Sequence, residues 1–192
     1  MAWVPVNESW GVDQLPHNSK DPRLASHMNT LYYLTKSLDP TRPVIGNDGW
    51  QMAITDLIAI HDYNQDAQEL KRRYEVFKAN RHASVFNHGL PILLEGYEYL
   101  GQPIMMTEFG GVKVTEQQAE GWGYGKDAKN YEEMVKRIDE LVTMLEGEPE
   151  ICGYCYTQLT DVEQEVNGLM TYDRQVKVAP EQLAEIFGRK RY

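Results

Sequence analysis

Short apolar runs alternate with amphipathic segments along most of this 192-residue chain. The apolar runs that predict strands lie at 2–7, 44–47, 57–60, 103–108 and 151–157. The segments with apolar residues at three- and four-residue spacing, which predict helices, lie at 22–38, 66–79, 128–146 and 180–187. Strands that alternate with helices are typical of an α/β fold with a parallel sheet. We therefore expect an α/β fold in a single domain over residues 1–192.

Two of the predicted strands deliver a glutamate at the same end. The run at 2–7 closes in Asn7 and is followed by Glu8, and the run at 103–108 ends in Glu108 before two glycines. A carboxylate at the end of a buried strand is costly unless it is paired or hydrogen-bonded. In barrels and open α/β folds, the carboxyl ends of the strands are also where active sites are built. Glu8 and Glu108 are therefore the candidate catalytic residues of a two-carboxylate mechanism.

The composition narrows the range of partners and cofactors. With 19 Lys and Arg against 29 Asp and Glu, the chain has a formal net charge of −10. This balance argues against a nucleic-acid partner, because proteins that bind nucleic acids carry a basic surface. No apolar run approaches the roughly 20 residues that span a bilayer, so we expect no membrane partner. The glycine motifs of nucleotide-binding folds are absent, and we expect no cofactor.

The two cysteines, Cys152 and Cys155, form a C-x-x-C motif, which is typical of redox or zinc sites. They fall in the predicted strand at 151–157, where positions three apart face opposite sides. No second pair of this kind and no H-x-x-x-H pattern completes a zinc site. We therefore expect no metal, and two small buried residues of a reduced protein. Reduced cysteines are typical of a cytoplasmic location, which we therefore expect. Met1 is followed at once by a predicted strand rather than by a targeting segment, but the signal of a longer parent protein would be absent from this chain.

Several motifs fall at the ends of the predicted strands in a fixed order. They are Asn7-Glu8, His61-Asp62-Tyr63, Thr107-Glu108-Phe109-Gly110-Gly111, and Gly153-Tyr154-Cys155-Tyr156 with Asn167-Gly168 further on. Together they resemble the catalytic barrel of glycoside hydrolase family 2, the family of β-galactosidases, β-glucuronidases and β-mannosidases. The resemblance spans nearly the whole chain. It implies a partial TIM (β/α)8 barrel that covers about strands 4 to 8, and the activity of a retaining β-glycoside hydrolase.

The resemblance also implies a role for each matching residue. Glu8 matches the acid/base carboxylate, and Glu108 matches the nucleophile that attacks the anomeric carbon. Asn7 matches the amide that binds the sugar 2-hydroxyl, and Tyr63 matches the tyrosine that donates a hydrogen bond to the nucleophile. Tyr156 takes a position that is often tryptophan in such barrels, where it would form a platform for the sugar ring.

Further candidates for substrate binding follow the predicted strands. Trp10, Trp50 and Trp122 lie in these loops, as does Tyr124, and sugars stack on aromatic faces. Packing beneath long loops explains these aromatic residues equally well. His61 either contacts the substrate or serves only as a hydrogen-bonded histidine of the interior.

The number of strands leaves two hypotheses open. A complete barrel has eight strands and about 250 residues, whereas this chain provides five predicted strands. The first hypothesis is the C-terminal part of a barrel that retains its catalytic pair, with a carbohydrate substrate and a missing N-terminal barrel half as partners. The second is a non-catalytic half-barrel that serves as an assembly or carbohydrate-binding module, and pairing of its open edges would produce a homo-oligomer. No residue identifies the sugar or the linkage.

Overall fold

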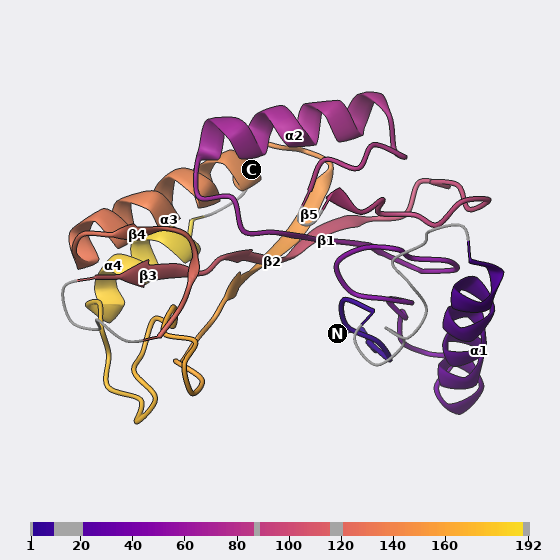
Figure 1. Ribbon diagram of the computed structural model, residues 1–192, viewed down its shortest axis with the longest axis horizontal. Coiled ribbons are helices and arrows are strands. Elements are labelled where there is room, and N and C mark those ends of the chain that lie inside the picture. Colours follow the sequence, from indigo (N-terminus) through magenta and orange to yellow (C-terminus); the bar gives the residue numbers. More distant parts are fainter. Residues whose placement is uncertain (1, 10–20, 87–88, 116–120, 190–192) are drawn as a thin grey trace. The chain divides into compact units, whose positions relative to one another are not determined.

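The protein is described by a computed structural model that covers residues 2–9, 21–86, 89–115 and 121–189. In chain order its elements are α1 (Pro22–Leu38), β1 (Ile58–Asp62), α2 (Ala67–Ala79), β2 (Ile104–Gly110), β3 (Val112–Val114), β4 (Tyr124–Ala128), α3 (Tyr131–Glu146), β5 (Ile151–Thr157) and α4 (Pro180–Phe187) (Figure 1). This order confirms the α/β class and all four predicted helices. Among the described residues, no helix has both the length and the apolar character needed to cross a membrane.

The strands form two separate sheets rather than one continuous wall. β1, β2 and β5 form a three-stranded sheet in the order β1-β2-β5, and β3 pairs with β4 in parallel in a two-stranded sheet. The prediction of a partial TIM barrel covering strands 4 to 8 is therefore wrong. A barrel wall needs each strand to pair with the next around the axis. The segments 2–7 and 44–47, predicted to be two of those strands, form only isolated bridges in the described part of the chain.

The two bridged segments run beside each other in parallel. Trp3 pairs with Val44 and Asn7 pairs with Asp48, but the residues between these two bridges do not form a ladder. Pro5 lies in this interval and has no backbone N–H to donate, which explains the interruption.

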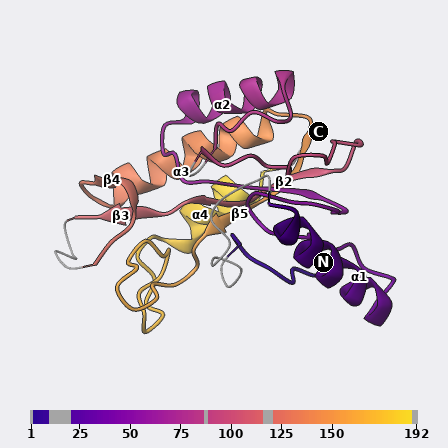
Figure 2. The ribbon, with the colours of Figure 1, turned by 45° about the vertical axis from the view of Figure 1, so that its right-hand side comes forward.

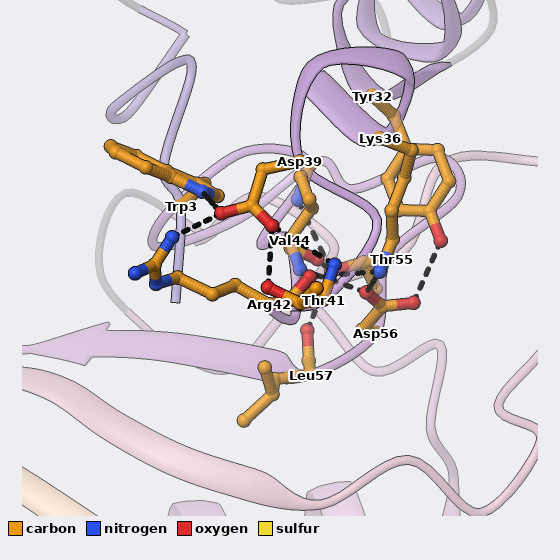
Figure 3. Close-up of polar contacts among 11 residues, drawn as sticks. Trp3, Tyr32, Lys36, Asp39, Thr41, Arg42, Val44, Thr55, Asp56 and Leu57 are labelled. Carbon is orange, nitrogen blue, oxygen red and sulfur yellow. Dashed lines mark hydrogen bonds and ion pairs between the residues drawn. The ribbon is translucent and has the colours of Figure 1, made fainter. Parts of the chain in front are cut away.

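Two side-chain carboxylates, one just after α1 and one just before β1, hold these bridged segments in place (Figure 3). Asp39 accepts a hydrogen bond of 2.9 Å from the indole nitrogen of Trp3. Asp56 accepts one of 2.8 Å from the backbone N–H of Val44 and one of 2.7 Å from the hydroxyl of Tyr32. These polar contacts thus fasten the two segments at the bridge between Trp3 and Val44.

The described chain divides into two compact units. The first unit comprises Met1–His61, Arg73–Thr107 and Glu150–Gly153. The second unit comprises Asp62–Arg72, Glu108–Pro149 and Tyr154–Tyr192. The strands β1, β2 and β5 each begin in the first unit and end in the second. The single domain over residues 1–192 stays a prediction.

The core of the first unit includes one face of α1. Asp21 caps this helix by accepting a hydrogen bond of 2.8 Å from the backbone N–H of Arg23, and Pro22 occupies the first turn, where its missing N–H does no harm. A cluster of buried side chains forms between the helix and the segments beside it: Val6, Leu24, Met28, Ala53 and Leu94. The capped helix thereby supports the segment that leads into Asn7 and Glu8.

The core of the second unit forms along α3, which lies beside α4 (Figure 2). Asn130 caps α3 through a hydrogen bond of 2.9 Å from the backbone N–H of Glu133. The buried stripe of this helix is the predicted one: Met134, Ile138, Leu141, Val142 and Leu145. β3 and β4 pack near the same helix, although the glycine-rich stretch that contains β4 was predicted to be a loop.

The cysteines differ from the prediction. Cys152 and Cys155 are both exposed and form no disulfide, so the expectation that they are buried is wrong. They lie in β5, which is at the edge of the three-stranded sheet among the described residues.

Candidate functional site

Glu8 is held in an uncommon backbone conformation in the first unit. Its N–H donates a hydrogen bond of 2.8 Å to the carbonyl of Asp48. Glu8 and Ser9 then take φ values of 54° and 61°, in the left-handed region that residues other than glycine adopt rarely. Buried Asn47 fixes this turn, because its side-chain oxygen accepts a hydrogen bond of 3.1 Å from the N–H of Ser9. Strained residues held this way are concentrated at functional sites.

His61 lies between two carboxylates of the first unit. Its ring is fully buried at the end of β1, with Nδ1 2.8 Å from Oε1 of Glu8 and Nε2 3.2 Å from Oδ1 of Asp48. A neutral imidazole has one N–H and can donate to only one of these oxygens. Nδ1 forms the hydrogen bond to Glu8, whereas Nε2 and Asp48 are within ion-pair distance without hydrogen-bond geometry. The arrangement suits a Glu8 side chain that gives up and regains a proton.

Neighbouring groups keep the imidazole in this position. The ring of Trp50 meets it edge-on at 5.9 Å between ring centroids. A Cβ atom at Gly49 would lie 2.7 Å from Nδ1 of His61, so this position needs glycine. Thr107, the last residue of β2 in the first unit, donates a hydrogen bond of 2.5 Å to Oδ1 of Asp48.

Glu108 has a different environment in the second unit. The hydroxyl of Tyr63 donates a hydrogen bond to Oε2 of Glu108. Tyr63 is only 5% exposed, and its burial raises the pKa of its hydroxyl, an effect to which the Glu108 carboxylate adds. Tyr63 therefore keeps its proton at any working pH and remains a donor. A hydrogen bond to the ionised form favours a charged carboxylate, which suits a nucleophile.

Aromatic rings surround this tyrosine. Tyr124 in β4 stacks on Tyr63 with 3.5 Å between ring centroids and 5° between ring planes. Trp122 meets Tyr124 edge-on at 5.5 Å and is 47% exposed. This indole is thus positioned on the second unit with a large part of its surface open to a ligand.

Tyr156 lies in β5 and packs against the glycine that ends β2. A Cβ atom at Gly110 would lie 2.2 Å from the ring of Tyr156, and Gly110 has a φ of 94°. Phe109 meets the same ring edge-on at 5.6 Å. Burial raises the pKa of Tyr156, whose hydroxyl donates to the carbonyl of Asn167 at 3.4 Å.

Each unit contains part of the predicted set of site residues. The first unit contains Asn7, Glu8, Trp50 and His61, and the second contains Tyr63, Glu108, Trp122 and Tyr156. Asn7 is exposed beside Glu8. Trp10 lies outside the described residues.

Sequence reasoning missed Asp48, and it named Tyr124 only as a residue on which a sugar could stack. Asp48 faces His61, and its position just after the predicted strand at 44–47 was the available signal. Tyr124 stacks on Tyr63, but only the folded structure reveals this contact, since the two lie 61 positions apart.

Comparison with known proteins finds a similar fold only among solved structures. No protein-family model and no curated protein sequence matches the chain. A β-D-glucuronidase from Dictyoglomus thermophilum matches with a TM-score of 0.66 at 17% identity, over 99% of this chain and 32% of that chain. A glycoside hydrolase family 2 β-galacturonidase from Eisenbergiella tayi, bound to glycerol, matches with a TM-score of 0.62 at 17% identity, over 88% and 31%.

A third structure contains a covalent ligand. This is Bacteroides uniformis β-glucuronidase 2 covalently bound to cyclophellitol-6-carboxylate aziridine, with a TM-score of 0.61 at 18% identity, over 92% of this chain and 22% of that chain. The chain spans about a third or less of the length of these three proteins. The chain therefore has a fold like that of one portion of glycoside hydrolase family 2 enzymes.

Proposed function

We propose that this chain carries the catalytic carboxylates of a retaining β-glycoside hydrolase. The observation that carries the proposal is the hydrogen bond from the buried, protonated Tyr63 to Glu108, in a fold like that of these glycosidases. Glu108 is the nucleophile, and Glu8 is the acid/base. The position of Glu8 against His61 supports its role, because the shared proton can be passed on.

The reaction proceeds in two displacements. Glu8 protonates the leaving oxygen while Glu108 attacks the anomeric carbon, which yields a covalent glycosyl-enzyme. Glu8 then removes a proton from a water molecule, which attacks the same carbon and releases the sugar with its original β configuration. In retaining enzymes the two carboxyl groups lie about 5–5.5 Å apart, and this function requires that separation for Glu8 and Glu108. None of these steps calls for a metal or a cofactor.

Other residues of the set would hold the sugar. Asn7 donates to the 2-hydroxyl, where hydrogen bonds strengthen as the transition state forms. The exposed Trp122 offers a face for a sugar ring, and Tyr156 and Trp10 are further aromatic candidates. Trp50 is only 3% exposed and packs against His61, so it is not proposed as a sugar contact. The substrate class is a β-glycoside, and the names of the similar structures make β-uronides the first to try.

To test this function, the full protein is assayed for hydrolysis of a panel of aryl β-glycosides and β-uronides. Proton NMR of the first-formed sugar should show the β anomer before it mutarotates. Release of the α anomer would contradict the double displacement. A Glu181→Gln variant, which alters an exposed carboxylate in the first turn of α4, serves as the matched control and should keep full activity.

The exposed indole of Trp122 favours a second candidate, a carbohydrate-binding or assembly module without turnover. Such a module would bind β-glycosides equally well in the wild type and in a Glu108→Gln variant. It would also self-associate, which a sizing column with light scattering detects. Turnover that depends on Glu108 excludes this candidate.

A further inference from the structure

We infer that Tyr124 is a positioning residue for the nucleophile, because it fixes the ring of Tyr63 whose hydroxyl donates to Glu108. This inference rests on the proposed role of Glu108. All three side chains belong to the second unit.

The stacked rings fix the direction of the hydrogen bond. The two planes are 5° apart, so Tyr124 covers one face of Tyr63 and leaves its ring little freedom to tilt. The hydroxyl lies in the plane of its own ring, and a tilt of the ring would move it away from Oε2 of Glu108. Tyr124 also keeps water from that face, and a donor acts more strongly on a carboxylate in a drier environment.

The backbone of Tyr124 is fastened to the segment that follows Glu108. Its N–H donates a hydrogen bond of 2.9 Å to the carbonyl of Gly111, and its carbonyl accepts one from the side-chain amide of Gln65. The same amide nitrogen lies 3.3 Å from the carbonyl of Gly110. Gln65 therefore joins β4 to the end of β2.

A residue of α3 fixes Gln65 in turn. Nη1 of Arg137 donates a hydrogen bond of 2.7 Å to Oε1 of Gln65, and the same guanidinium group donates to the carbonyl of Lys126 in β4. The position of Tyr124 is thus determined by a helix, a side-chain amide and a strand. Such support is what a precisely oriented functional group needs.

Gly111 provides the space for the stacked rings. It has a φ of 62°, and a Cβ atom there would lie 2.5 Å from Cδ2 of Tyr124 and 3.0 Å from Cδ1 of Tyr63. Any larger residue would force the two rings apart. A close approach of this kind, directly after the end of β2 and three residues after Glu108, supports a role in the site.

The first test follows the titration of Glu108 and needs no activity. The glutamate carboxyl carbons are labelled with ¹³C, and the Glu108 signal is assigned by its loss in Glu108→Gln. Removal of the phenol in Tyr63→Phe should raise the pKa of Glu108 by about one unit, since the ionised form loses a donor. Tyr124→Leu should produce most of that rise in the pKa of Glu108. Tyr124→Phe, which keeps the stacked ring, should produce none. In the double variant Tyr63→Phe/Tyr124→Leu, the pKa should rise no further than in Tyr63→Phe alone.

A milder variant guards against misfolding. Gln65→Met removes the hydrogen bond to the carbonyl of Tyr124 and leaves both rings in place. It should also raise the pKa of Glu108, but by less than Tyr124→Leu does. Circular dichroism identifies the variants that remain folded. The inference is overturned if the pKa of Glu108 in folded Tyr124→Leu equals the wild-type value. If Tyr124→Leu does not fold, an unchanged pKa of Glu108 in Gln65→Met overturns it instead. In that case the stacked rings serve packing alone.

The second test measures turnover on the aryl glycoside that the wild type cleaves best. Tyr124→Leu should lower kcat about tenfold, leave KM within about twofold, and move the acidic limb of the kcat profile to higher pH. A rise in KM with an unchanged acidic limb would assign Tyr124 to substrate contact and contradict the inference. If the wild type itself shows no turnover, the proposed function fails, while the titration of Glu108 still decides the role of Tyr124.

Discussion

Glu8 and Glu108 carry the same side chain in two contrasting environments. In the first unit, Glu8 faces a buried imidazole that also faces Asp48, so that a proton can pass between Glu8 and His61. In the second unit, Glu108 faces a phenol that keeps its proton. Identical residues are assigned to acid and nucleophile roles by surroundings of this kind.

The backbones of the two glutamates differ as well. Glu108 lies within the regular strand β2, whereas Glu8 and the residue after it occupy the left-handed region beside an isolated bridge. A regular strand holds a nucleophile rigidly in place. The turn at Glu8 is maintained by side-chain hydrogen bonds, such as that from Ser9 to Asn47, and depends on them.

Removal of the nucleophile should have the largest effect on activity. We expect Glu108→Gln to lower kcat by about 10⁴-fold or more, because the amide cannot form the glycosyl-enzyme. Initial rates on an activated aryl glycoside measure this, with Glu181→Gln as the control. A loss of less than about tenfold would remove Glu108 from the mechanism.

Replacement of the proton donor should have a smaller effect that depends on the substrate. We expect Glu8→Gln to lower kcat/KM by about 10²–10⁴-fold on a substrate with a basic leaving group, and far less on one whose leaving group needs no proton. A series of aryl glycosides of increasing leaving-group acidity measures the slope. An equal loss across the series would show that Glu8 does not act as an acid.

A change at His61 should affect Glu8 more than Glu108. We expect His61→Gln to lower kcat about 10–100-fold and to alter the basic limb of the pH profile, because the proton shared with Glu8 loses its second site. The acidic limb, which reports the ionisation of Glu108, should move less than the basic limb. An acidic limb that moves more than the basic limb would show that His61 acts mainly on the nucleophile.

The smallest expected effect concerns stability at high pH. Tyr32 in the first unit and Tyr63 in the second each donate a hydrogen bond to a carboxylate. Burial is the larger cause that raises the pKa of Tyr32 to about 12, and the hydrogen bond to Asp56 is the second cause. An unfolded tyrosine has a pKa of about 10, so the folded state keeps this proton longer. The resulting contribution, of order 2–3 kcal/mol for Tyr32, is present below about pH 10 and is lost as the pH rises towards 12.

Urea unfolding between pH 9 and pH 12 measures this contribution. Tyr32→Phe should flatten the alkaline fall in stability, and Tyr63→Phe should do the same, because the pKa of Tyr63 is also raised. The phenolate absorbance of Tyr32→Phe should lack one group that ionises near pH 12. An unchanged stability curve in both variants would mean that neither phenol is held by its carboxylate.

Local signals in the sequence account for the parts of the fold that were predicted. α1 starts at Pro22 and ends before Asp39, as the capping aspartate and the two later prolines indicate. β5 and α4 were predicted at their observed bounds. Signals of this kind depend on neighbouring residues only, and folding does not change them.

The remaining features depend on contacts between distant residues. The run at 2–7 has the composition of a strand, but Pro5 prevents a continuous ladder, so the barrel prediction failed. β4 begins at Tyr124 within a glycine-rich stretch that has no strand pattern, and its pairing with β3 supplies the order. The stacking of Tyr124 on Tyr63 and the contact of Asp48 with His61 likewise arise only when the chain folds.

Covalent trapping tests the central assignment most directly. The protein is incubated with a neutral cyclophellitol aziridine and with the 6-carboxylate form, and the labelled peptide is sequenced by mass spectrometry. We expect a single label on Glu108, absent from Glu108→Gln and formed more slowly in Tyr63→Phe. A label on Glu8 or on any other residue would contradict the account. The absence of any label from either reagent would also contradict it, if the protein hydrolyses a β-glycoside under the same conditions.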